Sequence, residues 1–316
     1  RGALAAGAAP TLLPGGRPVT DAAARAELES AWGLAEGGIP AEIGRSTDEM
    51  LAAAAGGELA GLLVGGVDPY DLADPELGLR ALDEVRFLVS LELRPSAVTE
   101  RADVVLPVAA AVHRAGSYLN WEGRVREFTT VIEATGQLPD CRVLDTLAVE
   151  MDADLYTQTP AAAAGELARL GTVTPAPGHA TGSARQDLPQ HGEFTVAAPE
   201  PGQARLATWR SLLDNGSLQD EEPHLTGTAR PAMALLGPAT AAGLGIAVGD
   251  AVTVGTDRGE LTVPAGLADL PDGVVWLPTN SGPSTVRRTL GVGHGALVGV
   301  RASVTEAPAD IEAGEL

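Results

Sequence analysis

The chain has 316 residues, which is long for a single ordinary domain and typical of two. Hydrophobic residues make up 45% and charged residues 20%, which excludes a disordered or fibrous chain, and the single cysteine excludes a disulfide framework, an iron–sulfur cluster or a Cys-ligated zinc held by this chain alone. Forty-two acidic residues face 21 basic ones, all of them arginine, and the net charge of −21 disfavours binding to nucleic acid or to anionic lipid.

The first 158 residues alternate helical segments with short apolar runs. Residues 12–16 predict a loop, and Thr20 is the expected N-cap of the first helix. Helices are expected over residues 20–32, 47–55 and 75–84. The continuous apolar runs at 60–64, 86–93 and 103–107 are typical of strands buried on both faces of a parallel sheet. This order of elements predicts a parallel α/β layer.

Residues 116–128 combine turn residues and aromatics, which indicates a β-hairpin or an ordered loop. A helix is expected over residues 139–151, with one apolar face made of Leu144, Leu147, Ala148 and Met151. From residue 159 to 203 the sequence becomes rich in Pro, Ala and Gly. We interpret this stretch as a connector between domains, helical near residues 161–170.

A second region of short elements follows, over residues 204–304. A helix is expected over 206–213 and a shorter one over 238–243. Strands are expected over residues 231–236, 251–256, 260–264, 274–277 and 296–304. Many short strands separated by Gly and Pro predict a small β-barrel, and residues 305–316 predict an acidic tail without structure.

Several stretches of the sequence carry a family resemblance. Residues 99–107 (TERADVVLP) and 116–124 (GSYLNWEGR) resemble a signature of molybdopterin oxidoreductases, and residues 238–254 with 273–278 resemble the dinucleotide-binding barrel of those enzymes. One branch of this superfamily is the most similar. The resemblance to it rests on Asn120–Arg124 (NWEGR), on residues 12–18 (LLPGGRP) and on residues 62–69 (LLVGGVDP). That branch is the G-subunit family of bacterial, in particular actinobacterial, NADH-quinone oxidoreductase (respiratory complex I).

The resemblance implies a Rossmann-like parallel-sheet domain over residues 1–158 and a double-psi β-barrel over 204–304, similar to molybdopterin dinucleotide-binding domains. Because the chain opens at Arg1 without Met, we expect it to be the C-terminal part of a longer polypeptide. The iron–sulfur clusters of that family would lie upstream, and this part would contain no cofactor. Its expected partners are other subunits of the peripheral arm, on the cytoplasmic side of the inner membrane, without a membrane span of its own.

Two polar turns are the candidate remnants of a pterin site. In the first, Asn120 would bind a base or pterin edge, Arg124 a phosphate, and Glu122 lies between them. The alternative is a local Glu122–Arg124 ion pair, with Tyr118 and Trp121 packed under the sheet. In the second turn, Thr279 and Asn280 would either line a ligand-binding mouth or close a turn.

The remaining reactive residues give no catalytic or metal centre. Cys141 lies at the start of a helix whose dipole would lower the pKa of its thiol, but without nearby ligands we expect it to be a half-buried structural residue. The five histidines are scattered, which disfavours a metal site. The pair Arg287–Arg288 would bind phosphate, meet an acidic neighbouring subunit or, by default, remain a solvated surface pair.

Two functions from different classes follow. The first is a structural portion of the complex I G subunit, not itself catalytic. The second is the C-terminal half of an active molybdopterin-dependent oxidoreductase, such as a formate dehydrogenase or nitrate reductase, which binds a molybdopterin guanine dinucleotide.

Overall fold

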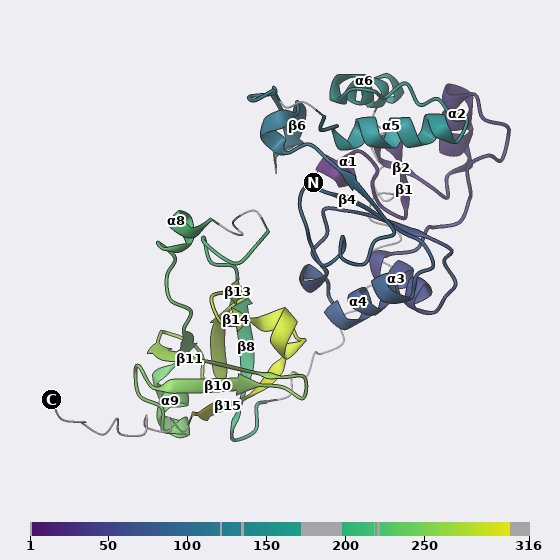
Figure 1. Cartoon of the computed structure of the whole chain (residues 1–316). Helices are drawn as coiled ribbons and strands as arrows, with labels where there is room; N and C mark the ends of the chain where they lie inside the picture. The colour runs from purple at the N-terminus through teal and green to yellow at the C-terminus, as the bar shows by residue number, and fades with distance from the viewer. Residues whose placement is uncertain are drawn as a thin grey trace. The chain divides into compact units, whose positions relative to one another are not determined.

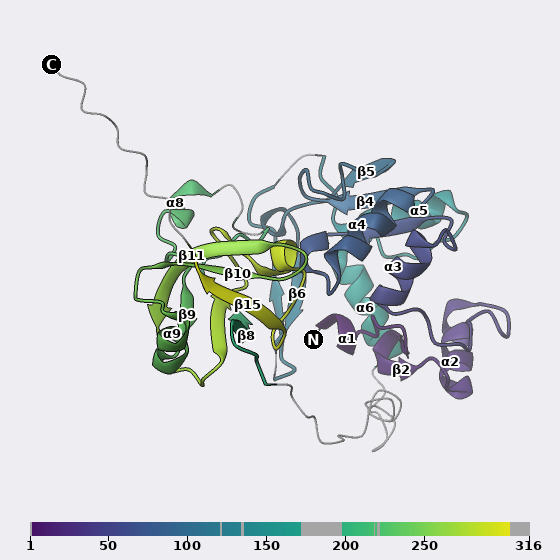
Figure 2. The same cartoon turned by 90° about the horizontal axis from the view of Figure 1, so that it is seen from below.

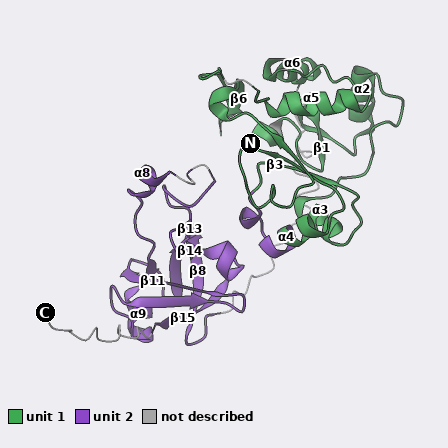
Figure 3. Cartoon of the chain, viewed as in Figure 1, with its two compact units in different colours: residues 1–67, 79–193 green, residues 68–78, 194–316 purple. Residues whose placement is uncertain are grey.

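The computed structural model describes residues 2–120, 122–133, 136–171, 198–217, 219 and 222–303. Trp121, the acidic tail and most of the expected connector therefore lie outside the described residues. The chain forms two compact units (Figure 3): the first contains residues 1–67 and 79–193, and the second contains residues 68–78 and 194–316. Residues 68–78 thus interrupt the sequence of the first unit but belong to the second.

The first unit is built on a three-stranded parallel sheet with the order β3-β4-β5. Helix α5 covers one face, where its Val143 and Leu147 pack with Leu91 of the central strand. In Figure 1, α3 and α4 lie on the opposite side of β4 from α5. The elements are α1 (Gly2–Ala5), β1 (Leu12–Leu13), β2 (Arg17–Pro18), α2 (Ala22–Trp32), α3 (Thr47–Ala55), β3 (Leu62–Gly65), α4 (Pro75–Glu84), β4 (Leu88–Glu92), β5 (Val104–Pro107), β6 (Gly116–Leu119), β7 (Val125–Phe128), α5 (Asp140–Glu150) and α6 (Pro160–Leu170).

The parallel sheet confirms the sequence prediction, but the expected burial of its outer strands is wrong. Leu88 and Leu91 of the central strand β4 are buried, whereas Leu63 of β3 and Val105 of β5 are 49% and 42% exposed. The reason is that β3 and β5 are edge strands of a sheet with only three members. An apolar run predicts a strand without telling whether that strand has two neighbours or one.

Three local expectations for the first unit also need correction. Asp21, not Thr20, caps α2, because its side chain accepts hydrogen bonds from Ala23 N and Ala24 N. Residues 12–16, expected to be a loop, contain β1 and a short 3₁₀ turn. On α5 the buried face contains Val143, while Met151 is 79% exposed, so the inward stripe is rotated from the one expected by about one residue.

The second unit is a closed barrel with the strand order β10-β11-β9-β12-β8-β15. β9 pairs in parallel with β11, and β8 in parallel with β12, while the other pairs are antiparallel. Figure 2 shows several of these strands curving around one interior, which Ala, Val, Leu and Ile side chains fill. The elements are β8 (Gln203–Trp209), α8 (Pro223–Thr226), β9 (Ala234–Leu236), α9 (Pro238–Leu244), β10 (Ala251–Gly255), β11 (Glu260–Leu267), β12 (Val274–Pro278), β13 (Asn280–Ser281), β14 (Ser284–Thr285), the π-helix η4 (Val286–Leu290) and β15 (Leu297–Ala302).

The helix expected over 206–213 is wrong, and its place is taken by β8. Ala204, Leu206 and Thr208 are buried and alternate with less buried neighbours, so the side chains follow the two-residue period of a strand. In the sequence this period is masked after Leu206, because the half-buried Ala207 is apolar and the buried Thr208 is polar. The other barrel strands and α9 confirm their predictions within a few residues.

Candidate functional site

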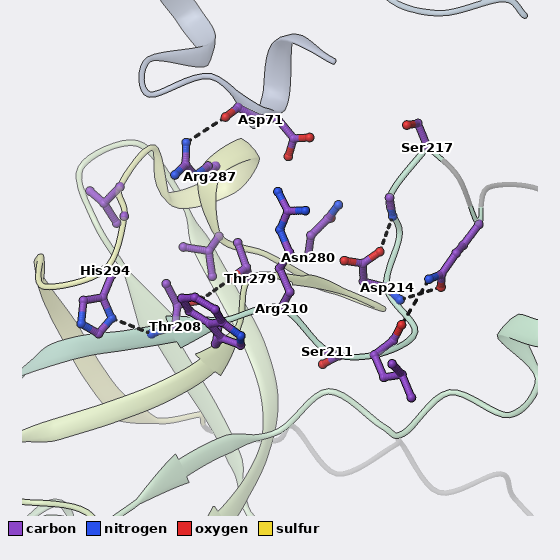
Figure 4. Close-up of a pocket in the computed structure, with 17 residues that line it drawn as sticks. Asp71, Thr208, Arg210, Ser211, Asp214, Ser217, Thr279, Asn280, Arg287 and His294 are labelled. Carbon is purple, nitrogen blue, oxygen red and sulfur yellow. Dashed lines mark hydrogen bonds between the residues drawn. The ribbon is translucent and has the colours of Figure 1, made fainter. Parts of the chain in front are cut away.

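A cavity of about 660 Å³ lies at one end of the barrel unit. Figure 4 shows its walls: the chain that leaves β8, the turn at β13, the start of η4 and the loop before β15. This volume is within the range of ordinary small-molecule sites. The cavity is therefore the strongest candidate site in the described part of the chain.

Thr208 and Thr279 form the polar floor of this pocket. β8 and β12 run in parallel and end together, which brings the two threonines side by side. Their hydroxyl oxygens are 2.9 Å apart and hydrogen-bonded, and Thr208 is buried. Thr208 continues the inward row of β8, so the apolar barrel interior changes to hydrogen-bonding groups at the pocket.

The pocket wall carries several hydrogen-bond donors. His294 Nδ1 accepts the backbone N–H of Thr208 at 3.3 Å, so in its neutral form the imidazole carries its proton on Nε2. Arg210 has no hydrogen bond or ion pair to any other described residue, and its guanidinium extends into the pocket in Figure 4. The neighbouring Trp209 is 76% exposed and presents an aromatic face. Donors with a stacking surface suit an anion attached to a planar ring.

Arg287 also lines the pocket, but the two N–H groups of its Nη1 already have acceptors. Its Nη1 donates to the backbone carbonyl oxygens of Asp71 and Leu72, each at 2.9 Å. The next residue, Arg288, lies over the ring of Tyr70 with its Cζ 4.4 Å from the ring centroid. Arg288 is exposed, as expected of a surface pair, whereas Arg287 is half-buried, and both arginines contact residues 70–72 of their own unit.

The turn between β6 and β7 contains the local ion pair that is the alternative to a pterin-binding turn. Asn120 Oδ1 accepts the backbone N–H groups of Glu122 and Arg124 at 3.0 and 2.9 Å, and Arg124 Nε forms an ion pair with Glu122 at 3.1 Å. The predicted packing of Tyr118 under the sheet is wrong: it is 64% exposed and stacks on Phe128. Of the predicted site residues, Thr279 and Asn280 line the pocket, whereas the other three close a hairpin turn in the first unit.

The surroundings of Cys141 disfavour the reactive thiolate form of its side chain. Burial is the main cause that raises the pKa of its thiol, and the nearby Asp140 carboxylate adds to it. The expected lowering of this pKa by the helix dipole is therefore wrong. The described residues contain no group of three or more His, Cys, Asp or Glu side chains placed to hold a metal ion. Nor does that part of the chain include a helix with the length and apolarity needed to cross a membrane.

The comparisons with known proteins agree with this architecture. Residues 205–309 match the family described as Molydopterin dinucleotide binding domain. The NADH-quinone oxidoreductase G subunit of Mycobacterium bovis is 52% identical over 306 residues, and that of Streptomyces coelicolor is 45% identical over 320 residues. These alignments cover 96% and 99% of this chain but 37% of each relative, so the chain spans just over a third of their length.

Among solved structures, acetylene hydratase from Pelobacter acetylenicus is similar over 87% of this chain and 45% of its own, with a TM-score of 0.50 and 18% identity. At this identity the likeness concerns the fold alone. Together with the matched family, it establishes a parallel-sheet α/β unit and a double-psi β-barrel of the dinucleotide-binding kind.

Proposed function

Since this chain is related to the NADH-quinone oxidoreductase G subunit over 96% of its length, we propose that it is a structural portion of such a subunit and holds no redox centre itself. Electrons would pass from NADH to quinone through iron–sulfur clusters bound by another part of the longer polypeptide. The observation that carries the proposal is how few cysteine ligands for an iron–sulfur cluster the sequence contains. The sequence has one cysteine, and burial raises the pKa of that thiol, which opposes the thiolate form that clusters require.

The same relationship supports a proposal for where the chain is located. It would belong to the peripheral arm of the complex, on the cytoplasmic side of the inner membrane, where other subunits of the arm would cover parts of its surface. The net charge of −21 supports contact with basic protein surfaces and opposes binding to anionic lipid or nucleic acid.

The test is elemental analysis and absorption spectroscopy of the purified chain beside a full-length relative, for example the homologous protein from Streptomyces coelicolor. We expect no stoichiometric iron or molybdenum and no visible chromophore in this chain, and iron in the full-length relative. Molybdenum in a one-to-one ratio, or a pterin chromophore released by acid, would overturn the proposal.

A second candidate function rests on the barrel pocket. The donors of Arg210, Asn280 and His294 fit the phosphates and base of a molybdopterin dinucleotide, in line with the matched family. When bound, that cofactor would supply the redox chemistry, and these residues would only bind and orient its nucleotide end. A guanine nucleotide that appears with molybdenum in extracts of the wild-type protein, and disappears in Arg210→Ala, would favour this candidate over the structural one.

A further inference from the structure

Residues 68–78, which we call the strap, fold against the barrel unit. Asp68 caps a short 3₁₀ turn at Pro69–Asp71, because its side chain accepts the backbone N–H of Tyr70 at 2.9 Å. Pro69 at the first position of this turn has its φ fixed in advance. The backbone of the strap is therefore locally ordered, and its carbonyl groups are held in a defined direction.

Three arginines of the barrel unit hold the strap. Arg287 donates to two backbone carbonyls of the strap, and Arg288 lies on its only aromatic ring. Arg258 Nη1 is 3.6 Å from Asp74 Oδ1 and 3.8 Å from Glu76 Oε2. Gly291 leaves room for this last side chain, since a Cβ at Gly291 would be 2.2 Å from Arg258 Cδ. The strap contains no basic residue, so its charge is complementary to these three cations.

The strap also forms part of the pocket wall. Asp71 lines the pocket, and in Figure 4 its carboxylate and the guanidinium of Arg210 both face into it. The carbonyl oxygens that bind Arg287 and the carboxylate of Asp71 are acceptors of the same kind as phosphate oxygens. The strap thus presents to this wall the groups that an anionic ligand would present.

We propose that the strap is an internal substitute for a phosphate-bearing ligand at the barrel pocket, and that it lowers the affinity of the pocket for such ligands. A ligand phosphate and the strap carbonyls would compete for the N–H groups of Arg287 Nη1. The Asp71 carboxylate would in addition repel an anion from the same space. The apparent affinity of the pocket is then reduced by the fraction of molecules in which the strap is in place.

This inference is independent of the proposed structural function, which concerns redox centres. The strap could regulate the pocket whether or not the chain holds a metal. Binding of a metal-free probe therefore tests this inference alone. Inorganic pyrophosphate is a suitable probe, because it carries the phosphate chemistry without a base or a pterin.

The experiment compares the 316-residue wild-type chain with the double variant Tyr70→Ala/Arg258→Ser. Neither residue lines the pocket, yet both contribute contacts that hold the strap. Calorimetric titration with pyrophosphate is expected to show binding about tenfold tighter or more in the double variant. Hydrogen exchange at the amides of Tyr70, Asp71 and Leu72 is measured on the same samples and is expected to accelerate.

Two further variants make the result specific. Arg287→Ala added to the double variant is expected to abolish the gain, because the competing donor is then missing. Arg301→Ala removes an arginine of the same barrel that pairs only with Glu260 among the described residues, and it is expected to leave both the titration and the exchange unchanged.

Three outcomes would overturn the inference. Equal affinity of wild type and double variant, with the strap amides released, would mean that the strap does not compete with the ligand. Unchanged exchange at those amides would mean that Tyr70 and Arg258 do not hold the strap. A gain in affinity that survives Arg287→Ala would place the binding elsewhere on the chain.

Discussion

Arg17 is a buried cation that joins three segments of the first unit. Its side chain is 3% exposed; its guanidinium forms two hydrogen bonds with the Glu27 carboxylate, at 2.8 and 3.1 Å. It also donates to the backbone carbonyls of Pro14, Leu170 and Gly171 at 2.7–3.0 Å. The guanidinium therefore ties the N-terminal turn and α2 to the end of α6. Its hydrogen bond is the main cause that holds the pKa of Glu27 below its ordinary value.

Arg17→Ala is expected to destabilise the first unit by about 3 kcal/mol, because the carbonyl oxygens it serves lose a charged donor. Equilibrium urea unfolding at neutral pH measures this loss. Arg45→Ala is the matched control: its partner Glu58 is also 2.8 Å away, but both side chains are largely exposed, so the loss should stay within about 0.5 kcal/mol. Equal losses in the two variants would contradict the role given to Arg17.

Sequence reasoning at the residue scale succeeds where contacts are local and fails where they are distant. Cys141 is half-buried, as the sequence predicts, but the direction of its pKa shift depends mainly on desolvation by burial, which the local sequence pattern does not give. Arg287 stands out in the sequence, yet its partners are 215 and 216 positions away and no local pattern predicts them. The sequence does not predict Arg210 as a pocket residue. The reason is that a helix is expected over 206–213, so the end of β8 next to Arg210 is not predicted.

At the scale of elements, helix α3 shows how well local signals define a boundary. Ser46 Oγ accepts the backbone N–H of Glu49 at 3.4 Å, and the Glu49 carboxylate accepts the backbone N–H of Ser46 at 2.7 Å. This capping box lies within four residues, so its pattern is readable from the sequence, and the predicted range 47–55 is confirmed. The burial of a strand, in contrast, depends on how many neighbours the sheet supplies, which explains the error at β3 and β5.

Ser46→Ala is expected to cost about 1 kcal/mol of stability, because one N–H group at the helix start loses its acceptor. Ser46→Asp should restore most of it, since a carboxylate serves equally well as an N-cap. Thermal unfolding followed by circular dichroism compares the three proteins. If the alanine and aspartate variants melt together below wild type, hydrogen bonding at the cap is not what stabilises α3.

The same box makes α3 sensitive to acid. The hydrogen bond from the Ser46 backbone is the main cause that lowers the pKa of Glu49, so the folded state favours the ionised carboxylate. The stabilisation is therefore complete above the pKa of an unfolded glutamate and is lost as the pH falls through the lower, folded value. Glu49→Gln should reduce the decline in stability between about pH 5 and pH 3, and an unchanged decline would contradict this assignment.

At the scale of the whole molecule, the described residues include two hydrophobic clusters that are built separately. The barrel interior consists of buried residues between Ala204 and Val300. A second cluster, around Leu91, Val108 and Val143, belongs entirely to the first unit. The sequence predicts both the α/β layer and the barrel, since each has its own periodicity. It does not predict that residues 68–78 belong to the barrel unit, because the three arginines that hold them follow about 180 to 220 residues later.

Because each interior draws on its own stretch of chain, we expect the two units to unfold in separate transitions. Leu277 is fully buried in the barrel, and Leu277→Ala should destabilise that transition by about 2–5 kcal/mol, while Arg17→Ala should affect only the other one. Pulsed hydrogen exchange along a urea gradient, resolved by peptide, assigns each transition to its unit.

Leu212→Ala, at a side chain 93% exposed, is the control and should change neither transition. In the Arg17→Ala/Leu277→Ala double variant the two losses should add within about 0.5 kcal/mol. A single transition shifted equally by either substitution would show that the chain unfolds as one cooperative block.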